Sequence, residues 1–113
     1  MTLNEVVEQL RLHVRCGGPR LQEEVTGGYA GDLLSDVMAH SKPGDLWVTL
    51  QVHANIVAVA VLKDLAGIVI VQGREPAEET LTRAAQENVP LLVSDLQAFE
   101  TIGKISAMIG NSP

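Results

Sequence analysis

Hydrophobic positions along the chain alternate between the spacing typical of helices and the patterns typical of strands. The amino-terminal stretch has apolar residues at helical intervals behind Thr2 and Glu5, a pair with capping-box spacing. Residues 21–25 alternate instead, which predicts a strand. The elements predicted in chain order are a helix over 2–13, a strand over 21–25 ending at Thr26-Gly27-Gly28, a helix starting near Gly31-Asp32, a strand over 46–50, a helix over 56–62, a strand over 68–71, a helix with Pro76 in its first position, a strand over 91–93, and a helix that Ser94 or Asp95 caps and Gly110 closes.

The apolar runs also predict which faces are buried. Residues 68–71 are continuously apolar, as a central strand covered on both faces requires. Residues 56–62 are rich in β-branched side chains that also suit a strand, and we interpret them as a fully buried helix with Asn55 near its start. The buried faces of the other helices are predicted at Leu33, Leu34, Val37 and Met38, at Leu81, Ala84 and Ala85, and at Leu96, Phe99, Ile102, Ile105 and Met108.

Strands that alternate with helices through short connections predict a parallel sheet with helices on its faces. We therefore expect an α/β fold, a single three-layer domain with a mostly parallel sheet flanked by helices. Its 113 residues fit one domain, 1–113, with the helix over 2–13 preceding an α/β core over 20–110. The apolar residues are almost all aliphatic, which suits a buried parallel sheet.

Charge and cysteine content exclude several classes of protein. The formal net charge is −6 and the lysines and arginines are scattered, so we expect no nucleic-acid partner. The longest apolar run, 56–62, is far shorter than the roughly 20 residues that cross a bilayer, and the first residues do not resemble a signal peptide. Cys16 is the only cysteine, which favours a reducing compartment. We expect a cytoplasmic protein without a membrane segment.

Candidate binding residues follow the predicted strands, because ligands of open parallel sheets bind beyond the carboxyl ends of the strands. Helix N-termini and glycines at that edge favour an anionic group. The alternative is that these small polar residues only form turns. The tentative ligand-binding residues are Thr26, Gly27, Gly28, Gln51, His53, Asn55, Gln72, Gly73, Ser94 and Asp95.

No catalytic or metal-binding motif is present. The segment 26–32 lacks the Lys-Ser or Lys-Thr ending of a P-loop and does not fit G-x-G-x-x-G. Asp32, Asp36 and His40 are spaced to share a helix face, which supplies too few converging ligands for a metal site. His53 is equally compatible with a ligand contact and with a hydrogen bond to the backbone. We therefore assign no catalytic residue and no metal ligand, and the sequence leaves any cofactor unknown.

The chain resembles the DRTGG domain family over most of its length, from about Leu21 to Ile109. The pentapeptide Asp-Arg-Thr-Gly-Gly, after which the family is named, is not intact in this chain. Its nearest match is Glu24–Gly28, which lacks the Asp and the Arg. The resemblance therefore does not imply a function that depends on that charge pair. The stretches that carry the resemblance are Val25–Met38, Trp47–Ala60 and Leu65–Ile70.

The resemblance implies an α/β domain like the N-terminal domain of HPr kinase. Similar domains occur in phosphotransacetylases and CBS-domain pyrophosphatases, where they are regulatory, accessory or dimer-forming rather than catalytic. Stand-alone relatives occur in anaerobes, some encoded beside iron hydrogenase genes. We expect a non-catalytic regulatory or assembly domain, a homodimer that senses a small anionic or nucleotide ligand. Two alternatives stay open: a small enzyme acting on a phosphorylated or nucleotide substrate with His53 and Asp32 or Asp95, and a structural partner of a larger enzyme such as an iron hydrogenase or another anaerobic redox system.

Overall fold

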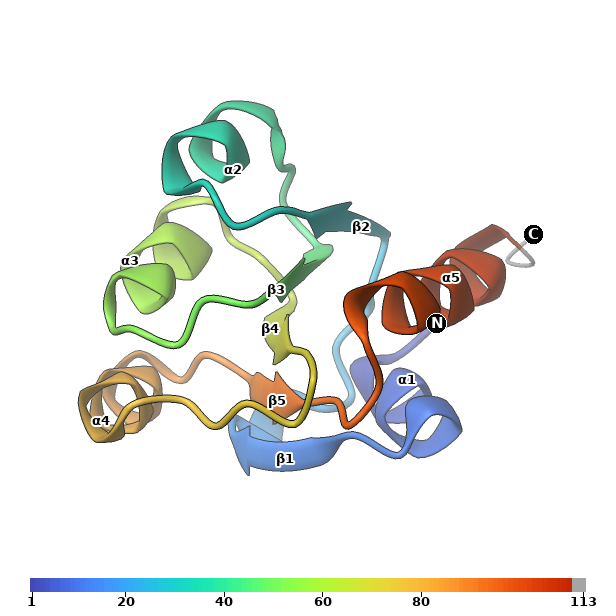
Figure 1. Cartoon of the computed structure of the whole chain (residues 1–113), viewed down its shortest axis with the longest axis horizontal. Coiled ribbons are helices and arrows are strands. Elements are labelled where there is room, and N and C mark those ends of the chain that lie inside the picture. Colours follow the sequence, from blue (N-terminus) through green and yellow to red (C-terminus); the bar gives the residue numbers. More distant parts are fainter. Residues whose placement is uncertain (111–113) are drawn as a thin grey trace.

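A five-stranded sheet in the order β1-β5-β4-β3-β2 forms the middle layer of the computed structural model, which describes residues 1–110 (Figure 1). The neighbouring pairs β2–β3, β3–β4 and β4–β5 are parallel, and β1 is antiparallel to β5. The predicted α/β class with a mostly parallel sheet is therefore confirmed. The strands are β1 (His13–Cys16), β2 (Gly27–Ala30), β3 (Asp45–Thr49), β4 (Gly67–Ile70) and β5 (Leu91–Val93).

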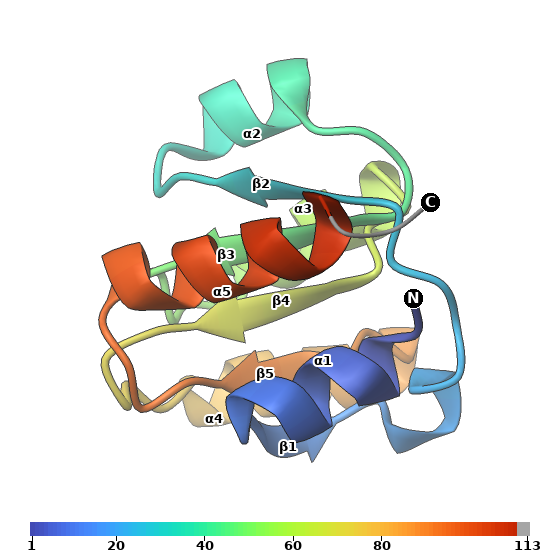
Figure 2. The same ribbon diagram turned by 90° about the vertical axis from the view of Figure 1, so that its right-hand side faces the viewer.

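Helices cover both faces of the sheet, as Figures 1 and 2 show. One face carries α2, α3 and α4, and the other carries α1 and α5. Successive side chains along each strand point to opposite faces of the sheet and so belong to two separate hydrophobic cores. Val48 and Val69 pack toward α1 and α5, while Trp47 and Ile68 pack toward α2, α3 and α4. The helices are α1 (Leu3–Leu10), a 3-10 turn η1 (Gly18–Arg20), α2 (Leu34–His40), α3 (Asn55–Leu62), α4 (Glu78–Glu87) and α5 (Ala98–Gly110).

The central strands follow their sequence pattern closely. Every residue of β4 is buried, as its continuous apolar run predicts. The predicted strands over 46–50 and 91–93 and the predicted helix over 56–62 are confirmed within one residue. The capping box of Thr2 and Glu5 is also formed. Gly110 is the last described residue, so the end of α5 beyond it, like residues 111–113 of the expected domain, lies outside the described residues.

The amino-terminal prediction fails where the chain leaves its first helix. The helix ends at Leu10 rather than at residue 13, with Arg11 in the left-handed conformation. His13–Cys16 then forms β1, which we predicted as the end of a helix followed by a break. This edge strand has mostly exposed side chains and exists because β5 offers it a pairing partner, so no local apolar pattern indicates it.

The predicted strand over 21–25 is wrong. Those residues run antiparallel to the amino terminus and form only the isolated bridge Thr2–Glu24. The first parallel strand comes later, at Gly27–Ala30, where glycine and alanine weaken the strand signal. Thr26 and Gly27 thus stand at the amino end of a strand, and Gly28 lies inside it.

Three helix details also differ from the sequence prediction. Helix α2 begins at Leu34 and leaves Leu33 68% exposed rather than buried. Pro76 precedes α4, whose first residue is Glu78, and Ala85 is exposed. Helix α5 begins at Ala98, so neither Ser94 nor Asp95 is its cap.

Two helices expose apolar side chains that the sequence predicted as buried. The helix α3 is not fully buried, since Val61 and Leu62 are 45% and 71% exposed. On α5 the predicted stripe is only partly buried: Ile105 is in the core, while Phe99 is 88% and Ile102 37% exposed. An apolar pattern identifies a helix without showing which apolar side chains the rest of the chain covers. None of the described helices is long and apolar enough to cross a membrane.

Candidate functional site: the strand-end rim

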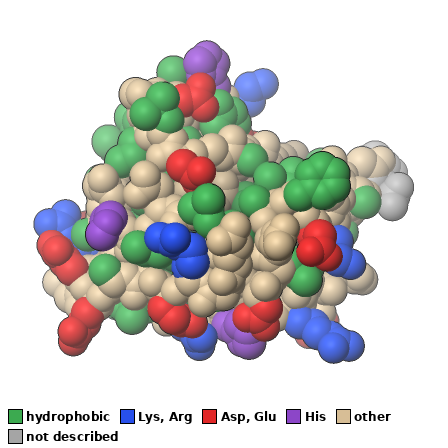
Figure 3. Space-filling view, viewed as in Figure 1, with side chains coloured by type: hydrophobic (Ala, Val, Ile, Leu, Met, Phe, Trp, Pro, Cys, Tyr) green, Lys and Arg blue, Asp and Glu red, His purple; other side chains and the backbone are tan. Residues whose placement is uncertain are grey.

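The carboxyl ends of the four parallel strands meet at one edge of the sheet, which faces the viewer in Figure 1 and lies to the left in Figure 2. We call this edge the strand-end rim. It consists of the loops between each parallel strand and the following helix, 31–33, 50–54, 71–77 and 94–97, together with Asn55 at the start of α3. Figure 3 shows this face with apolar, acidic and basic side chains interspersed and no patch of a single charge.

Asp32 joins the first two loops of the rim. Its Oδ1 accepts hydrogen bonds from the Thr49 hydroxyl at 2.8 Å and from the Leu50 N–H at 2.7 Å. The Gln51 side-chain amide returns a bond to the Asp32 carbonyl at 3.0 Å. Hydrogen bonds to a carboxylate are among the stronger ones in proteins, so the loop after β2 fixes the loop after β3.

The Val52 carbonyl connects the loop after β3 to the start of α4. It accepts the Ala77 N–H at 3.0 Å and the Thr80 hydroxyl at 2.7 Å. Thr80 is completely buried, so its hydroxyl depends on this partner. The bond holds the loop that carries His53 at a fixed distance from the loop that carries Arg74.

Gln72 and Gly73 both adopt the left-handed conformation, with φ of 63° and 64°. Their N–H groups bond to the carbonyls of Leu96 and Ser94, each at 2.8 Å. A left-handed conformation costs a residue other than glycine on the order of 1 kcal/mol, and these two bonds offset that cost at Gln72. The loops after β4 and β5 are therefore joined through their backbones.

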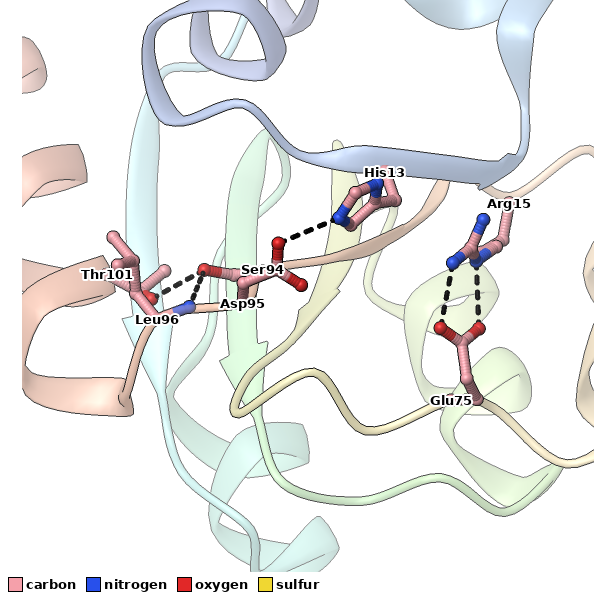
Figure 4. Close-up of polar contacts among 7 residues, drawn as sticks. All are labelled: His13, Arg15, Glu75, Ser94, Asp95, Leu96 and Thr101. Atoms are coloured by element: carbon pink, nitrogen blue, oxygen red, sulfur yellow. Dashed lines mark hydrogen bonds and ion pairs between the residues drawn. The ribbon is translucent and has the colours of Figure 1, made fainter.

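Ser94 supports the rim from inside the protein. Its buried hydroxyl lies 2.9 Å from the Thr101 hydroxyl and accepts the Leu96 N–H at 3.2 Å (Figure 4). Thr101 also donates to the Gln97 carbonyl at 2.9 Å. These contacts fix the start of α5, and they leave the Ser94 side chain fully engaged and out of reach of solvent.

A hydrogen bond and an ion pair bind β1 to the rim (Figure 4). His13 Nε2 lies 3.0 Å from Asp95 Oδ2. The Arg15 guanidinium donates two parallel bonds of 2.8 Å to Glu75. Those bonds lower the pKa of Glu75 and raise the pKa of Arg15. Because β1 runs antiparallel to β5, its first residue, His13, stands beside the last residue of β5 and reaches the strand-end rim.

With this geometry established, comparison with known proteins identifies the family. The model of the DRTGG domain matches residues 5–108. The chain belongs to the DRTGG domain family. A search of curated proteins gave no match to this DRTGG domain.

Among solved structures, the DRTGG domain is similar to the CBS and DRTGG domains of the regulatory region of the Clostridium perfringens pyrophosphatase, which was crystallised with its activator diadenosine tetraphosphate. The match has a TM-score of 0.68 at 13% sequence identity and covers 96% of this chain. The chain corresponds to 45% of that structure. The similarity confirms the fold.

The DRTGG domain brings most of the predicted ligand-binding residues together at the rim. The exceptions are the residues next to the misplaced strand: Thr26 bonds through its N–H to the Gly44 carbonyl at the amino-terminal edge of the sheet, and Gly27 pairs with Asp45 there. Gly28 faces α5 from within β2. The predicted residues that lie on the rim are Gln51, His53, Asn55, Gln72, Gly73, Ser94 and Asp95.

Among the described residues, the polar side chains that the rim of the DRTGG domain exposes without a hydrogen bond or ion pair include His53, Asn55 and Arg74, beside the amides of Gln72 and Gln97. An imidazole, an amide and a guanidinium together offer donors that suit an oxyanion. His13 and Arg15, which also reach the rim, were missed because β1 was not predicted. The exposed polar positions of 13–16 were the only available signal.

The residues weighed for catalysis and metal binding are engaged elsewhere. Asp36 accepts the Tyr29 hydroxyl at 2.5 Å and pairs with His40, while Asp32 is bound to the loop after β3. The bond from Tyr29 raises the pKa of that phenol. Within residues 1–110, no three ligating side chains lie close enough to hold a metal ion. Over the same range His53 forms no hydrogen bond with Asp32 or Asp95.

Proposed function

We propose that this DRTGG domain is a non-catalytic regulatory or assembly domain that responds to a small anionic or nucleotide ligand bound at the strand-end rim. The observation that carries the proposal is the combination of a rigid frame with unused donors. The backbone and Asp32 bonds fix four loops, and the frame presents His53, Asn55 and Arg74 to solvent without partners. A ligand that contacts two of these loops would change how they are held relative to each other.

Two further observations support this function. The carboxyl edge of a parallel sheet is where such folds bind ligands. The structurally similar pyrophosphatase region has a nucleotide, diadenosine tetraphosphate, as its activator. We keep the cytoplasm as the expected location, since Cys16 is the only cysteine and forms no disulfide within the chain.

A thermal-shift screen tests the ligand response. The full chain is heated with ATP, diadenosine tetraphosphate, acetyl phosphate, coenzyme A or magnesium ions. A ligand at about 100 times its dissociation constant should add close to 3 kcal/mol of stability. We expect a nucleotide or another anion to raise the melting temperature, because the rim offers cationic and amide donors while its carboxylates, Asp32, Glu75 and Asp95, already have partners.

Two variants locate the response. Arg74→Gln should remove most of the shift because it deletes the unpaired cation of the rim. Lys42→Gln makes the same change of charge in the exposed turn at the opposite edge of the sheet and should keep the shift. Equal shifts in both variants, or no stabilising ligand at all, would contradict the proposal.

We further propose that the domain is a homodimer that pairs through α3. This helix has no charged residue, yet its outer face exposes Val61 and Leu62 beside a groove of about 350 Å³. Helices that are apolar on all sides are normally covered. The groove carries one cation, Arg83, and one anion, Glu87, so the face is neutral and can match its own copy across a two-fold axis. Each copy carries a net charge of −6, so two copies would repel each other if they approached through surfaces other than this neutral face.

Leu62→Lys tests this pairing by placing a charge at the centre of the face. We expect light scattering to give the mass of a dimer for the natural chain and of a monomer for the variant, since an unpaired charge is costly to bury. Leu33→Lys, at a leucine with 68% exposure directly before α2, is the matched control and should stay dimeric. A natural chain that is monomeric at high concentration would refute the homodimer.

A further inference from the structure

The two edges of the sheet are protected differently. At one edge, β1 carries the polar side chain of His13, the charged side chain of Arg15, and an irregular register between Val14 and Cys16. Charges and bulges of this kind prevent a sheet edge from pairing with other chains. At the other edge, β2 has the sequence Gly-Gly-Tyr-Ala, no charge, and a regular register with β3. Among the strands of residues 1–110, β2 alone has an unprotected edge.

The outward-facing backbone of β2 is accessible. The Gly31 N–H bonds to the Val48 carbonyl, so alternate residues of this strand direct their N–H and C=O groups toward β3. The intervening residues, Gly28 and Ala30, direct theirs away from the sheet, and both residues are exposed. In Figures 1 and 2 no strand lies beyond β2.

An apolar groove runs between this edge and α5. Its volume is about 320 Å³, and none of its lining residues is charged. Ile102, Ile105 and Ile109 form the α5 side, and Gly28 and Ala30 form the strand side. Phe99 is 88% exposed in the first turn of the same helix. A strand added beside β2 would place every second side chain over this groove.

We propose that the β2 edge and the α5 groove bind an extended, uncharged segment of a partner protein, which adds to the sheet as a further strand. Backbone hydrogen bonds to Gly28 and Ala30 would hold the segment, and large apolar side chains at alternate positions would fill the groove. This is the mode in which sheet edges recognise extended peptides. The surface lies away from the side chains exposed on the rim, so the inference does not depend on ligand binding there.

A second copy of this chain fits the surface less well than such a segment. A copy pairing edge to edge through its own β2 would present only Gly28 and Ala30 toward the helix side of the sheet. A hydrogen atom and a methyl group cannot fill a groove of about 320 Å³. The unfilled space therefore favours a segment with branched or aromatic side chains.

Nuclear magnetic resonance of the full chain with a blocked peptide of alternating threonine and valine tests the proposal. We expect the amide signals of Gly28 and Ala30 and the methyl signals of Ile102 and Ile105 to shift at millimolar peptide. A peptide of the same composition with a central proline should shift them much less, because proline disrupts strand pairing. No shift, or shifts confined to other faces, would overturn the proposal.

Two variants of α5 separate the groove from the helix as a whole. Ile102→Lys should weaken the peptide by about tenfold or more, since it places a charge in the apolar groove. Ala107→Lys makes the same helix more basic outside the groove and should leave binding unchanged. If instead Ile102→Lys converts a dimer into a monomer while Leu62→Lys does not, the edge is occupied by a second copy and the proposal is wrong. Ala30→Pro, which removes an outward N–H, should weaken the peptide even if Ile102→Lys fails to fold.

Discussion

Gly17→Ala is expected to destabilise the protein by about 3 kcal/mol or more, the combined cost of backbone strain and overpacking. Gly17 has φ of 87°, a conformation that side chains rarely adopt. Its position is buried, and a Cβ there would overlap Cα and N of Pro90, which are backbone atoms that cannot rotate away. Gly17 also ends β1, so the strain would act on the strand that delivers His13 and Arg15 to the rim.

The neighbouring glycine supplies the control. Gly18 has no positive φ, and a Cβ there would meet nothing within 4 Å. Gly18→Ala should therefore change the free energy of unfolding by no more than about 0.5 kcal/mol. Urea denaturation of the three proteins measures the difference. Similar midpoints for the two variants would show that the turn between β1 and η1 is not constrained as the structure indicates.

Trp47→Ala is expected to cost about 4 kcal/mol, at the upper end of the range for large-to-small substitutions in a core. Trp47 is fully buried in the middle of β3, in the core that α2, α3 and α4 cover. Its Nε1–H donates to the Gly31 carbonyl at 2.8 Å, so the side chain also holds the loop that precedes α2. The substitution therefore removes both core volume and a support of the rim.

Trp47→Phe separates the two contributions. Phenylalanine retains most of the apolar contact and loses the donor, so we expect a cost of about 2 kcal/mol, which includes an unsatisfied Gly31 carbonyl. Denaturant titration followed by circular dichroism gives both values, since the variants lack the only tryptophan. A loss below about 1 kcal/mol for Trp47→Ala would contradict the packing described for β3.

The parts of the fold that the sequence predicts are those that local pattern controls. The apolar run at 68–71 can only be a buried strand, and the capping pair at Thr2 and Glu5 fixes the start of α1. The wrong predictions concern strands whose formation depends on pairing with a neighbouring strand. β1 is held by β5 and by the side-chain contacts His13–Asp95 and Arg15–Glu75, and β2 is built from residues with low strand propensity. In neither β1 nor β2 does the local sequence therefore show the alternating apolar pattern that predicts a strand.

The candidate site could be predicted from the sequence only where the strands that carry it were predicted correctly. Gln51, His53 and Gln72 lie on the rim because their strands were placed correctly and parallel strands end at one edge. Thr26 and Gly27 were assigned to the wrong edge of the sheet. They follow the strand predicted over 21–25, but they stand at the start of the strand that actually forms, β2. His13 could not be assigned to the rim without knowing that β1 is antiparallel.

The exposed apolar surfaces were hidden from sequence reasoning for a related reason. In α3 every side has apolar residues, so periodicity cannot distinguish the face toward the sheet from the face with Val61 and Leu62. On α5 Thr101 and Ile105 are buried, whereas Ile102, which lines the same groove as Ile105, is 37% exposed. Only the packed structure shows which apolar residues lack cover.

The measurement that tests the central claim most directly is a titration of the isotope-labelled full chain with ATP and with diadenosine tetraphosphate, followed by nuclear magnetic resonance. Binding at the strand-end rim predicts shifted amide signals for 53–55 and 72–74, and unchanged signals for the turn at 41–44 on the opposite edge. Saturable changes on the rim would support a ligand-responsive regulatory domain. Unchanged signals for 53–55 and 72–74 with both nucleotides would contradict it.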